Sequence, residues 1–574
     1  MRGVINRRFI KDMQSEIKNC QNCKNDFIIE IEDFNFYEKI KVPPPTWCPD
    51  CRHQRRLAIR NERVFYYRKC DSCQERILSY YHPDKKQIVW CPTCWWSDKL
   101  DPFIYGRDFD FSKPFFEQFK ELNEITPTLS LDIVNCKDSE YVSYCGDDNF
   151  CYFDIAGERN EYCYFCKFVK YSKDCIDCSF VYNSELNYEC VNCHKVYGSS
   201  FLDKCTDCSS CHLMYDCRGC TDCFGCWNLR NKSYYIFNKP YSREEYKKIV
   251  SNFNRKSFSA LEKMKREFKE LSKNRIVKYA TLINSPSSTG DDIFNCKNMK
   301  ESFDVSDAEN GKWLCDVLDA KECYDIDFSL YKPSFNIELI STLNLGNSGF
   351  CSASHYSNDI WYSNKCNNSS DLFGCVAVNK KKYCILNKQY EKEKYFELKN
   401  KIIEHMKKTG EYGQFFPIGI SGFGYNETIA QEYFPLTQEK CKEKFLPWWN
   451  ESAGTYGKET LNIKDLPDSL DDMTDEILKE VLACSCGRNY KIVSYELKLY
   501  QKLSLPIPRE CPNCRHEKRN KIAGIRKLWH RNCMCKKENH SHRAEKCEVG
   551  FETSYSPDRP EIVYCEKCYQ QEVY

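Results

Sequence analysis

The sequence lacks any run of about 18 apolar residues, and residues 1–10 carry charge without an apolar stretch. Neither a membrane-spanning helix nor a secretory signal is therefore expected. Several enzyme motifs are also missing: a P-loop, His-Glu-x-x-His, Gly-x-Ser-x-Gly and a paired His/Cys nucleophile. These absences favour a non-enzymatic, cytoplasmic protein with no small-molecule substrate and no membrane partner.

The chain also lacks a strong net charge, since it carries a formal charge of +2 over 574 residues. This balance hides an uneven distribution, because both ends are basic and residues 131–240 are mildly acidic. Basic ends suggest contact with a polyanion. The length predicts several domains.

Cysteine is the residue that the chain has in excess, with 41 copies. Such a sequence is either a disulfide scaffold or a metal protein. In a reducing compartment, pairs spaced Cys-x-x-Cys are expected to be metal ligands or buried thiols.

The two ends of the chain are copies of each other. Three cysteines of the first copy recur after a shift of 463 positions: Cys23, Cys48 and Cys51 become Cys486, Cys511 and Cys514. Three more recur at shift 474, where Cys73, Cys91 and Cys94 become Cys547, Cys565 and Cys568.

The interior is also duplicated. The segment beginning at Cys226 recurs at Cys375, and cysteines within each half repeat at separations of 12 or 15. A short fixed period in aromatic, turn-rich text predicts a β-solenoid. The expected fold is mainly β with short helices, in which zinc-ribbon modules at both termini flank two cysteine-rich solenoids. The expected segments are a double zinc-ribbon module (1–127), the first solenoid (128–240), a helical connector (241–280), the second solenoid (281–389), another connector (390–482) and a second double module (483–574).

Helices are predicted between these segments. Residues 241–274 have helical spacing, and Ser242 with Glu245 three positions on is typical of a capping box. Further helices are expected over 113–124 and 390–409 and near 472–482.

Paired cysteine knuckles predict structural zinc, because tetrahedral zinc accepts four thiolates and then has no open position for water. About four ions are expected. In the last group the fourth ligand is open among Cys533, Cys535, His540 and His542, with Cys535 favoured. The alternative is a set of free core cysteines or another metal. The predicted ligands are Cys20, Cys23, Cys48, Cys51, Cys70, Cys73, Cys91, Cys94, Cys484, Cys486, Cys511, Cys514, Cys535, Cys547, Cys565 and Cys568.

The interior cysteines are predicted to pack the solenoids instead. At shift 149 Cys211 aligns with Ile360 and Cys223 with Leu372. A metal ligand cannot be exchanged for Ile or Leu, whereas a small buried residue can. Metal binding or disulfides in the first solenoid remain the alternative.

A basic segment follows each Cys-Pro-x-Cys knuckle and, if helical, presents its cations on one face. Such a stripe fits a phosphate-backbone clamp. The alternative is a solvated helix face whose arginines offset the zinc–thiolate charge or pair with acidic residues. The predicted contacts are Arg52, Arg55, Arg56, Arg60, Arg63, Arg515, Lys518, Arg519 and Arg526.

Residues 48–63, 95–98, 105–112, 424–428 and 557–565 resemble a family of large zinc-ribbon, cysteine-repeat proteins of candidate-phyla bacteria and giant viruses. The resemblance spans nearly the whole chain. It implies zinc-ribbon modules and carries no established activity.

Two functional hypotheses follow. The first is a structural-zinc protein that binds RNA, the ribosome or DNA through its basic modules on a solenoid spacer. The second is a protein-interaction or structural scaffold whose solenoid surface is the binding face. A thiol oxidoreductase is a third, less favoured possibility.

Overall fold

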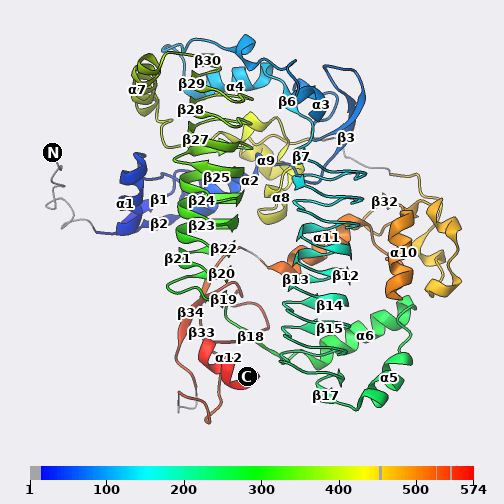
Figure 1. Ribbon diagram of the computed structural model, residues 1–574. Coiled ribbons are helices and arrows are strands. Elements are labelled where there is room, and N and C mark those ends of the chain that lie inside the picture. The colour runs from blue at the N-terminus through cyan, green and yellow to red at the C-terminus, as the bar shows by residue number, and fades with distance from the viewer. Residues whose placement is uncertain (1–13, 451–455, 525, 543–545) are drawn as a thin grey trace. The chain divides into compact units, whose positions relative to one another are not determined.

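The computed structural model describes residues 14–450, 456–524, 526–542 and 546–574, and confirms the mainly β fold with its solenoids (Figure 1). Residues 1–10, on which the expectation about a secretory signal rests, lie outside this part of the chain. Two compact units are present. One lies within Met1–Ser130 and Ala280–Asn450, and the other within Leu131–Tyr279 and Glu451–Tyr574. No helix in the described ranges is long and apolar enough to cross a membrane.

The first solenoid, in the second unit, repeats every 12 residues. Its strands pair in parallel, so that Lys167 lies beside Ser179 and Ser179 beside Val191. Figure 1 shows these strands as a ladder. They are β7 (Ile133–Val134), β8 (Cys145–Gly146), β9 (Lys167–Lys170), β10 (Lys173–Ile176), β11 (Ser179–Tyr182), β12 (Glu185–Tyr188), β13 (Val191–His194), β14 (Tyr197–Asp203) and β15 (His212–Tyr215).

The chain turns a corner at residues whose backbone lies in the left-handed region. Over most of the solenoid such a residue recurs at every third position, so each 12-residue coil has several corners. Asparagine and aspartate tolerate this conformation, whereas an aromatic residue there is strained. Stacking with the next coil offsets that strain. Phe168 and Phe180 are both left-handed, and their rings stack with centroids 5.1 Å apart.

The residue after each corner points into the coil, and in the first solenoid cysteine occupies this position more often than any other residue. Cys175, Cys178 and Cys190 are fully buried in this core. A thiol also donates to nearby carbonyls, as Cys178 does to Ile176 at 3.4 Å. The prediction that these cysteines pack the solenoid is therefore confirmed.

The second solenoid, in the first unit, fills the same positions with larger aliphatic residues, such as Leu314, Ile326 and Leu339. Its register is also 12 over most coils, but Leu282 pairs with Ile293, 11 positions on. Lys321 pairs with Ser334, 13 positions on, because the chain turns at both Tyr331 and Lys332. The strands are β19 (Leu282–Ile283), β20 (Gly290–Phe294), β21 (Lys297–Lys300), β22 (Ser302–Ser306), β23 (Glu309–Leu318), β24 (Lys321–Leu330), β25 (Ser334–Gly346), β26 (Gly349–Ser352), β27 (His355–Trp361), β28 (Ser370–Phe373), β29 (Lys382–Ile385) and β30 (Lys388–Gln389).

The connecting helices agree with the sequence in three of four places. Residues 241–274 form α5 (Arg243–Ser251) and α6 (Phe258–Leu271), and Ser242 with Glu245 makes the expected capping box. Helices α4 (Phe115–Ile125) and α7 (Lys392–Thr409) also match their predictions. The helix predicted near 472–482 is wrong. That segment forms two 3-10 turns, η6 (Leu470–Asp472) and η7 (Asp475–Leu478), and the strand β31 (Leu482–Ala483).

Each terminal module packs beside the solenoid of its own unit. The N-terminal module contains two hairpins and short helices: β1 (Glu16–Asn19), β2 (Asp26–Ile29), α1 (Ile31–Ile40), α2 (Pro49–Leu57), β3 (Tyr66–Lys69), β4 (Arg76–Ser79) and α3 (Pro92–Trp95). The C-terminal module repeats most of this order with β31, β32 (Asn489–Tyr490), α10 (Ser494–Leu503), α11 (Pro512–Ala523), β33 (Trp529–Asn532), β34 (Gly550–Thr553) and α12 (Glu566–Val573).

Candidate metal centres

The structure brings the predicted knuckles together in groups of four thiols. In each group the four sulfur atoms lie within 4.8 Å of one another. Three groups contain the residues expected from the sequence. They are Cys20/Cys23/Cys48/Cys51, Cys70/Cys73/Cys91/Cys94 and Cys484/Cys486/Cys511/Cys514.

The sulfur separations fit a metal and not a disulfide. Cys23 and Cys48 are 3.6 Å apart, Cys73 and Cys91 3.9 Å, and Cys486 and Cys511 3.7 Å. A disulfide needs about 2.05 Å. Zinc bonded to sulfur at about 2.3 Å in a tetrahedron places neighbouring sulfurs about 3.8 Å apart. The four-cysteine groups could therefore hold metal ions of this size.

Backbone amides favour ionisation of the first cysteine in both groups of the N-terminal module. The N–H of Cys48 donates to the Cys20 sulfur at 3.2 Å, and the N–H of Cys91 donates to Cys70 at 3.3 Å. Burial opposes ionisation of Cys20, but backbone donors outweigh it and lower its pKa to about 6. The same balance lowers the pKa of Cys70 to about 7. Thiolates are the form that binds metal.

The last group differs from the prediction in its fourth ligand. Cys533, and not Cys535, joins Cys547, Cys565 and Cys568. The N–H of Cys565 donates to the Cys533 sulfur at 3.2 Å, as Cys91 donates to Cys70. The sequence held a signal for this, since Cys70 shifted by 463 positions falls on Cys533.

The second knuckle of each module also starts a helix. Cys48 is the N-cap of α2 with Pro49 at its first position, and Cys511 is the N-cap of α11 with Pro512 there. The helix dipole favours a thiolate at this end. A metal at the knuckle would thus fix the direction of the following helix.

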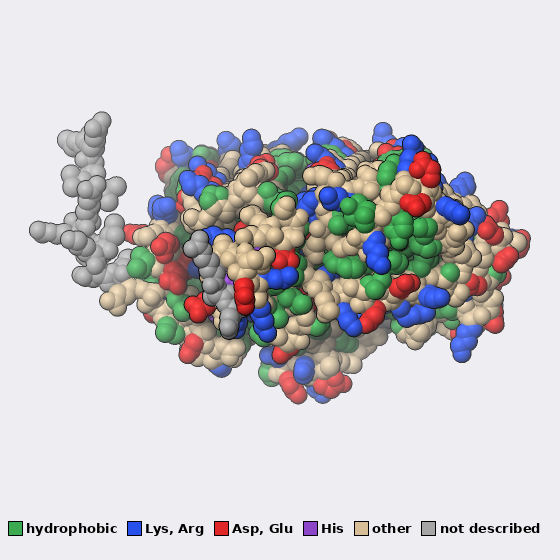
Figure 2. Space-filling view, turned by 90° about the horizontal axis from the view of Figure 1, so that it is seen from below, with side chains coloured by type: hydrophobic (Ala, Val, Ile, Leu, Met, Phe, Trp, Pro, Cys, Tyr) green, Lys and Arg blue, Asp and Glu red, His purple; other side chains and the backbone are tan. Residues whose placement is uncertain are grey.

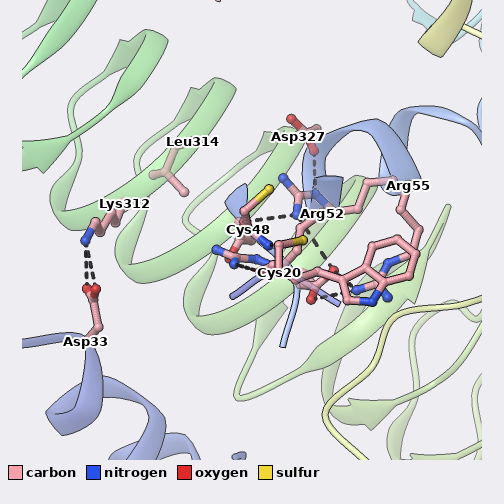
Figure 3. Close-up of polar contacts among 12 residues, drawn as sticks. Cys20, Asp33, Cys48, Arg52, Arg55, Lys312, Leu314 and Asp327 are labelled. Carbon is pink, nitrogen blue, oxygen red and sulfur yellow. Dashed lines mark hydrogen bonds and ion pairs between the residues drawn. The ribbon is translucent and has the colours of Figure 1, made fainter. Parts of the chain in front are cut away.

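The arginines of α2 point into the second solenoid. Asp325, at a corner of β24, accepts from Arg52 Nε at 3.0 Å and from Arg56 Nη1 at 3.1 Å. Arg56 Nε also donates to Asp327 at 2.6 Å. Figure 3 labels Arg52, Arg55 and Asp327 in this region, together with Cys20 and Cys48 of the first metal group. All these groups are buried, so the ion pairs are internal contacts of the unit.

Neighbouring contacts extend this interface. Arg55 donates to Glu338 at 3.2 Å and lies over the Trp47 ring, and Arg60 donates to Ser341. Lys312 pairs with Asp33 of α1 at 2.8 Å, as the dashed lines of Figure 3 show. The N-terminal module is thus held along the flank of the solenoid.

The C-terminal module repeats the arrangement on the first solenoid. Asp177, again a left-handed corner residue, accepts from Arg515 Nη1 at 2.5 Å and from Arg519 Nη1 at 2.7 Å. Arg519 also donates to the Phe165 carbonyl at 2.9 Å. In both modules, two arginines one helical turn apart enclose one corner aspartate.

These arginines therefore do not form the solvent-facing stripe that the sequence predicts. Arg52, Arg55, Arg56, Arg60, Arg515 and Arg519 are all buried. Helix α2 also ends at Leu57, so that Arg60 and Arg63 lie beyond it. Arg63 and Arg526 are partly buried. Of the nine predicted contact residues, all of which the structure describes, Lys518 alone is exposed, and it pairs with Glu510.

On the face of the molecule that Figure 2 shows, lysine and arginine are interspersed with aspartate and glutamate among the described residues and do not form one basic surface. The carboxylates that pair with the arginines were missed by sequence reasoning. Their signal was weak, because Asp177, Asp325 and Asp327 look like ordinary turn residues of the repeat.

Comparison with known proteins adds no functional assignment to this geometry. No protein-family model matches the chain, and a search of curated proteins finds no match.

Proposed function

We propose that this chain is a non-enzymatic structural-zinc scaffold, in which metal-bound modules brace two solenoids that bind a macromolecular partner. The observation that carries the proposal is the buried arginine interface. Arginines that follow each knuckle form ion pairs with carboxylates of the solenoid, as Arg56 does with Asp325 and Asp327. Groups used in this way stabilise the fold and are not available to a polyanion.

The donor sets support a structural role for the metal. Each of the four groups offers four cysteines, which completes a tetrahedral shell and leaves no position for water or substrate. A structural zinc contributes on the order of 10–16 kcal/mol to the folding of a small module. Such an ion would hold α2 and α11 at the angle at which their arginines reach the corner aspartates.

Chelation followed by hydrogen exchange tests this role. Removing the metal from the full chain is expected to speed exchange in the hairpin β3–β4, and also in β24 and β25, against which α2 packs. Unchanged exchange in these strands after verified metal loss would contradict the proposal.

Binding to RNA, the ribosome or DNA is the rival proposal. It would have to use exposed lysines, because most of the predicted arginine contacts are buried. Lys518 and Lys521 of α11 are exposed, so their change to glutamate perturbs surface charge and leaves the buried ion pairs intact. A scaffold is expected to bind labelled RNA or duplex DNA no better than the non-specific range of roughly 10⁻⁴ to 10⁻⁶ M at physiological salt. Tighter, salt-dependent binding that is lost in the double variant would favour the rival.

A further inference from the structure

The loop of the last zinc group is much longer than its counterpart in the N-terminal module. The hairpins match residue for residue, since Tyr66 pairs with Ser79 and, at shifts of 463 and 474, Trp529 pairs with Thr553. The shifts differ by 11, so the C-terminal copy has eleven extra residues between Cys533 and Cys547, the first two members of its four-cysteine group. This insertion carries Cys535, His540 and His542, which the N-terminal loop lacks.

The inserted donors converge beside the four-cysteine group. Donor atoms of Cys535, His540, His542 and Cys568 all lie within 4.8 Å of one another. The sulfur of Cys535 is 3.2 Å from Nδ1 of His540. Cys535, His540 and Cys568 are 0%, 4% and 1% exposed, so three of the four donors are shielded from water. Cys568 belongs to both groups.

Helix α12 orients the inserted histidine in the way that metal ligands are usually oriented. His540 Nε2 lies 2.9 Å from a carboxylate oxygen of Glu572. A proton on Nε2 satisfies that contact and leaves the Nδ1 lone pair facing Cys535 and Cys568. A carboxylate behind a ligating histidine is the common second contact of zinc sites. Because Glu572 and Cys568 are one turn apart on α12, one helix positions both groups.

A second contact fixes the insertion on the same helix. The side chain of Gln571 accepts from the backbone N–H of Ser541 at 3.1 Å. Ser541 lies between the two histidines, so this bond holds both of them over the end of α12.

We propose that the C-terminal module holds a second metal ion, bound by Cys535, His540 and His542 and bridged to the four-cysteine ion through the Cys568 thiolate. Two thiolates and two imidazoles suit zinc in tetrahedral geometry. The shell is closed, which makes this ion structural too. The second ion also reduces the net negative charge that four buried thiolates leave around a single dication. The proposal goes beyond the scaffold function, which requires only the four-cysteine groups.

Native mass spectrometry of the zinc-loaded full chain counts the ions. Five are expected, one for each of the four cysteine groups and one for the inserted site. The double variant His540→Ala/His542→Ala is expected to hold one ion fewer and to keep native hydrogen exchange in β33 and β34. A matched pair then tests the bridge. Cys568→Ser should lose two ions, whereas Cys94→Ser, at the equivalent position of the N-terminal module, should lose one.

The possible outcomes separate this inference from the proposed function. Four ions in the unmodified chain, or an unchanged count in the histidine variant, would overturn the second ion and leave the scaffold standing. No bound ions would overturn both. If Cys568→Ser fails to fold, the histidine variant still decides. X-ray absorption provides an independent check, since a bridged pair places two ions about 3.5–4 Å apart.

Discussion

Replacement of Arg56 by methionine tests whether the arginines of α2 are structural. Its side chain is 1% exposed and contacts Asp325 at 3.1 Å and Asp327 at 2.6 Å. Both carboxylates are buried, and the change leaves them with one cation fewer. Removing one partner of a buried pair costs about 3–5 kcal/mol. On a solvated stripe the same substitution would cost within about 0.5 kcal/mol.

Hydrogen exchange with mass spectrometry measures this effect strand by strand. A loss of about 3–5 kcal/mol corresponds to exchange roughly 10²- to 4 × 10³-fold faster in β24 and β25, because each 1.4 kcal/mol is a factor of ten. Strands β11 and β13 belong to the other unit and serve as an internal reference.

Two variants control for charge and for burial. Lys518→Met removes an exposed cation whose ion pair with Glu510 is expected to contribute about 0–1 kcal/mol. Arg56→Met combined with Asp327→Leu replaces the pair by apolar side chains and should recover part of the loss. If Arg56→Met changes exchange in β24 and β25 no more than Lys518→Met changes it in β11 and β13, the buried interface is not what holds the module.

Three further changes have distinct expected results. Cys178→Ala removes a fully buried thiol of the solenoid core and should lower the free energy of unfolding by about 1 kcal/mol. The zinc content, measured by elemental analysis, should stay unchanged, and loss of an ion would instead assign metal to the solenoid. Cys70→Ser should lose one ion in native mass spectrometry and open the β3–β4 hairpin to exchange, and retention of all ions would contradict the assigned group. Burial raises the pKa of Glu496 from 4.5 to about 7 despite the nearby Arg515, so the carboxyl binds its proton more tightly in the folded chain than in the unfolded chain. Its contribution to stability therefore falls as pH rises, by about 1 kcal/mol between pH 6 and 7. Glu496→Gln should remove this dependence from the free energy of urea unfolding measured at the two pH values, and an equal pH dependence in both proteins would refute the assignment to Glu496.

The repeats made much of the fold predictable. The recurrence of Cys23, Cys48 and Cys51 at one fixed shift located both modules. The separations of 12 or 15 between interior cysteines predicted a solenoid, and the structure shows that its usual coil has 12 residues. Alignment of Cys211 with Ile360 predicted that these cysteines pack the core, and both positions are indeed buried.

The interface between module and solenoid was not predictable in the same way. Periodicity places Arg52 and Arg56 on one helix face, but it does not say what that face meets. The partners Asp325 and Asp327 lie about 270 positions away in the sequence. Asp325 looks like one of the aspartates that the repeat uses at its left-handed corners, and Asp327 lies within strand β24. A long-range ion pair leaves no local pattern. The prediction of a helix near 472–482 was wrong because the apolar residues Leu470 and Ile477 are buried from two separate 3-10 turns. The local spacing of apolar residues does not distinguish such turns from one continuous helix.

X-ray absorption at the zinc edge of the purified, tag-free chain is the most direct measurement of the cysteine groups. We predict at least four ions for each chain, one for each four-cysteine group, with a shell dominated by sulfur at about 2.3 Å. Material that is folded and free of metal, or zinc surrounded mainly by oxygen, would contradict the assignment of the knuckles as metal centres.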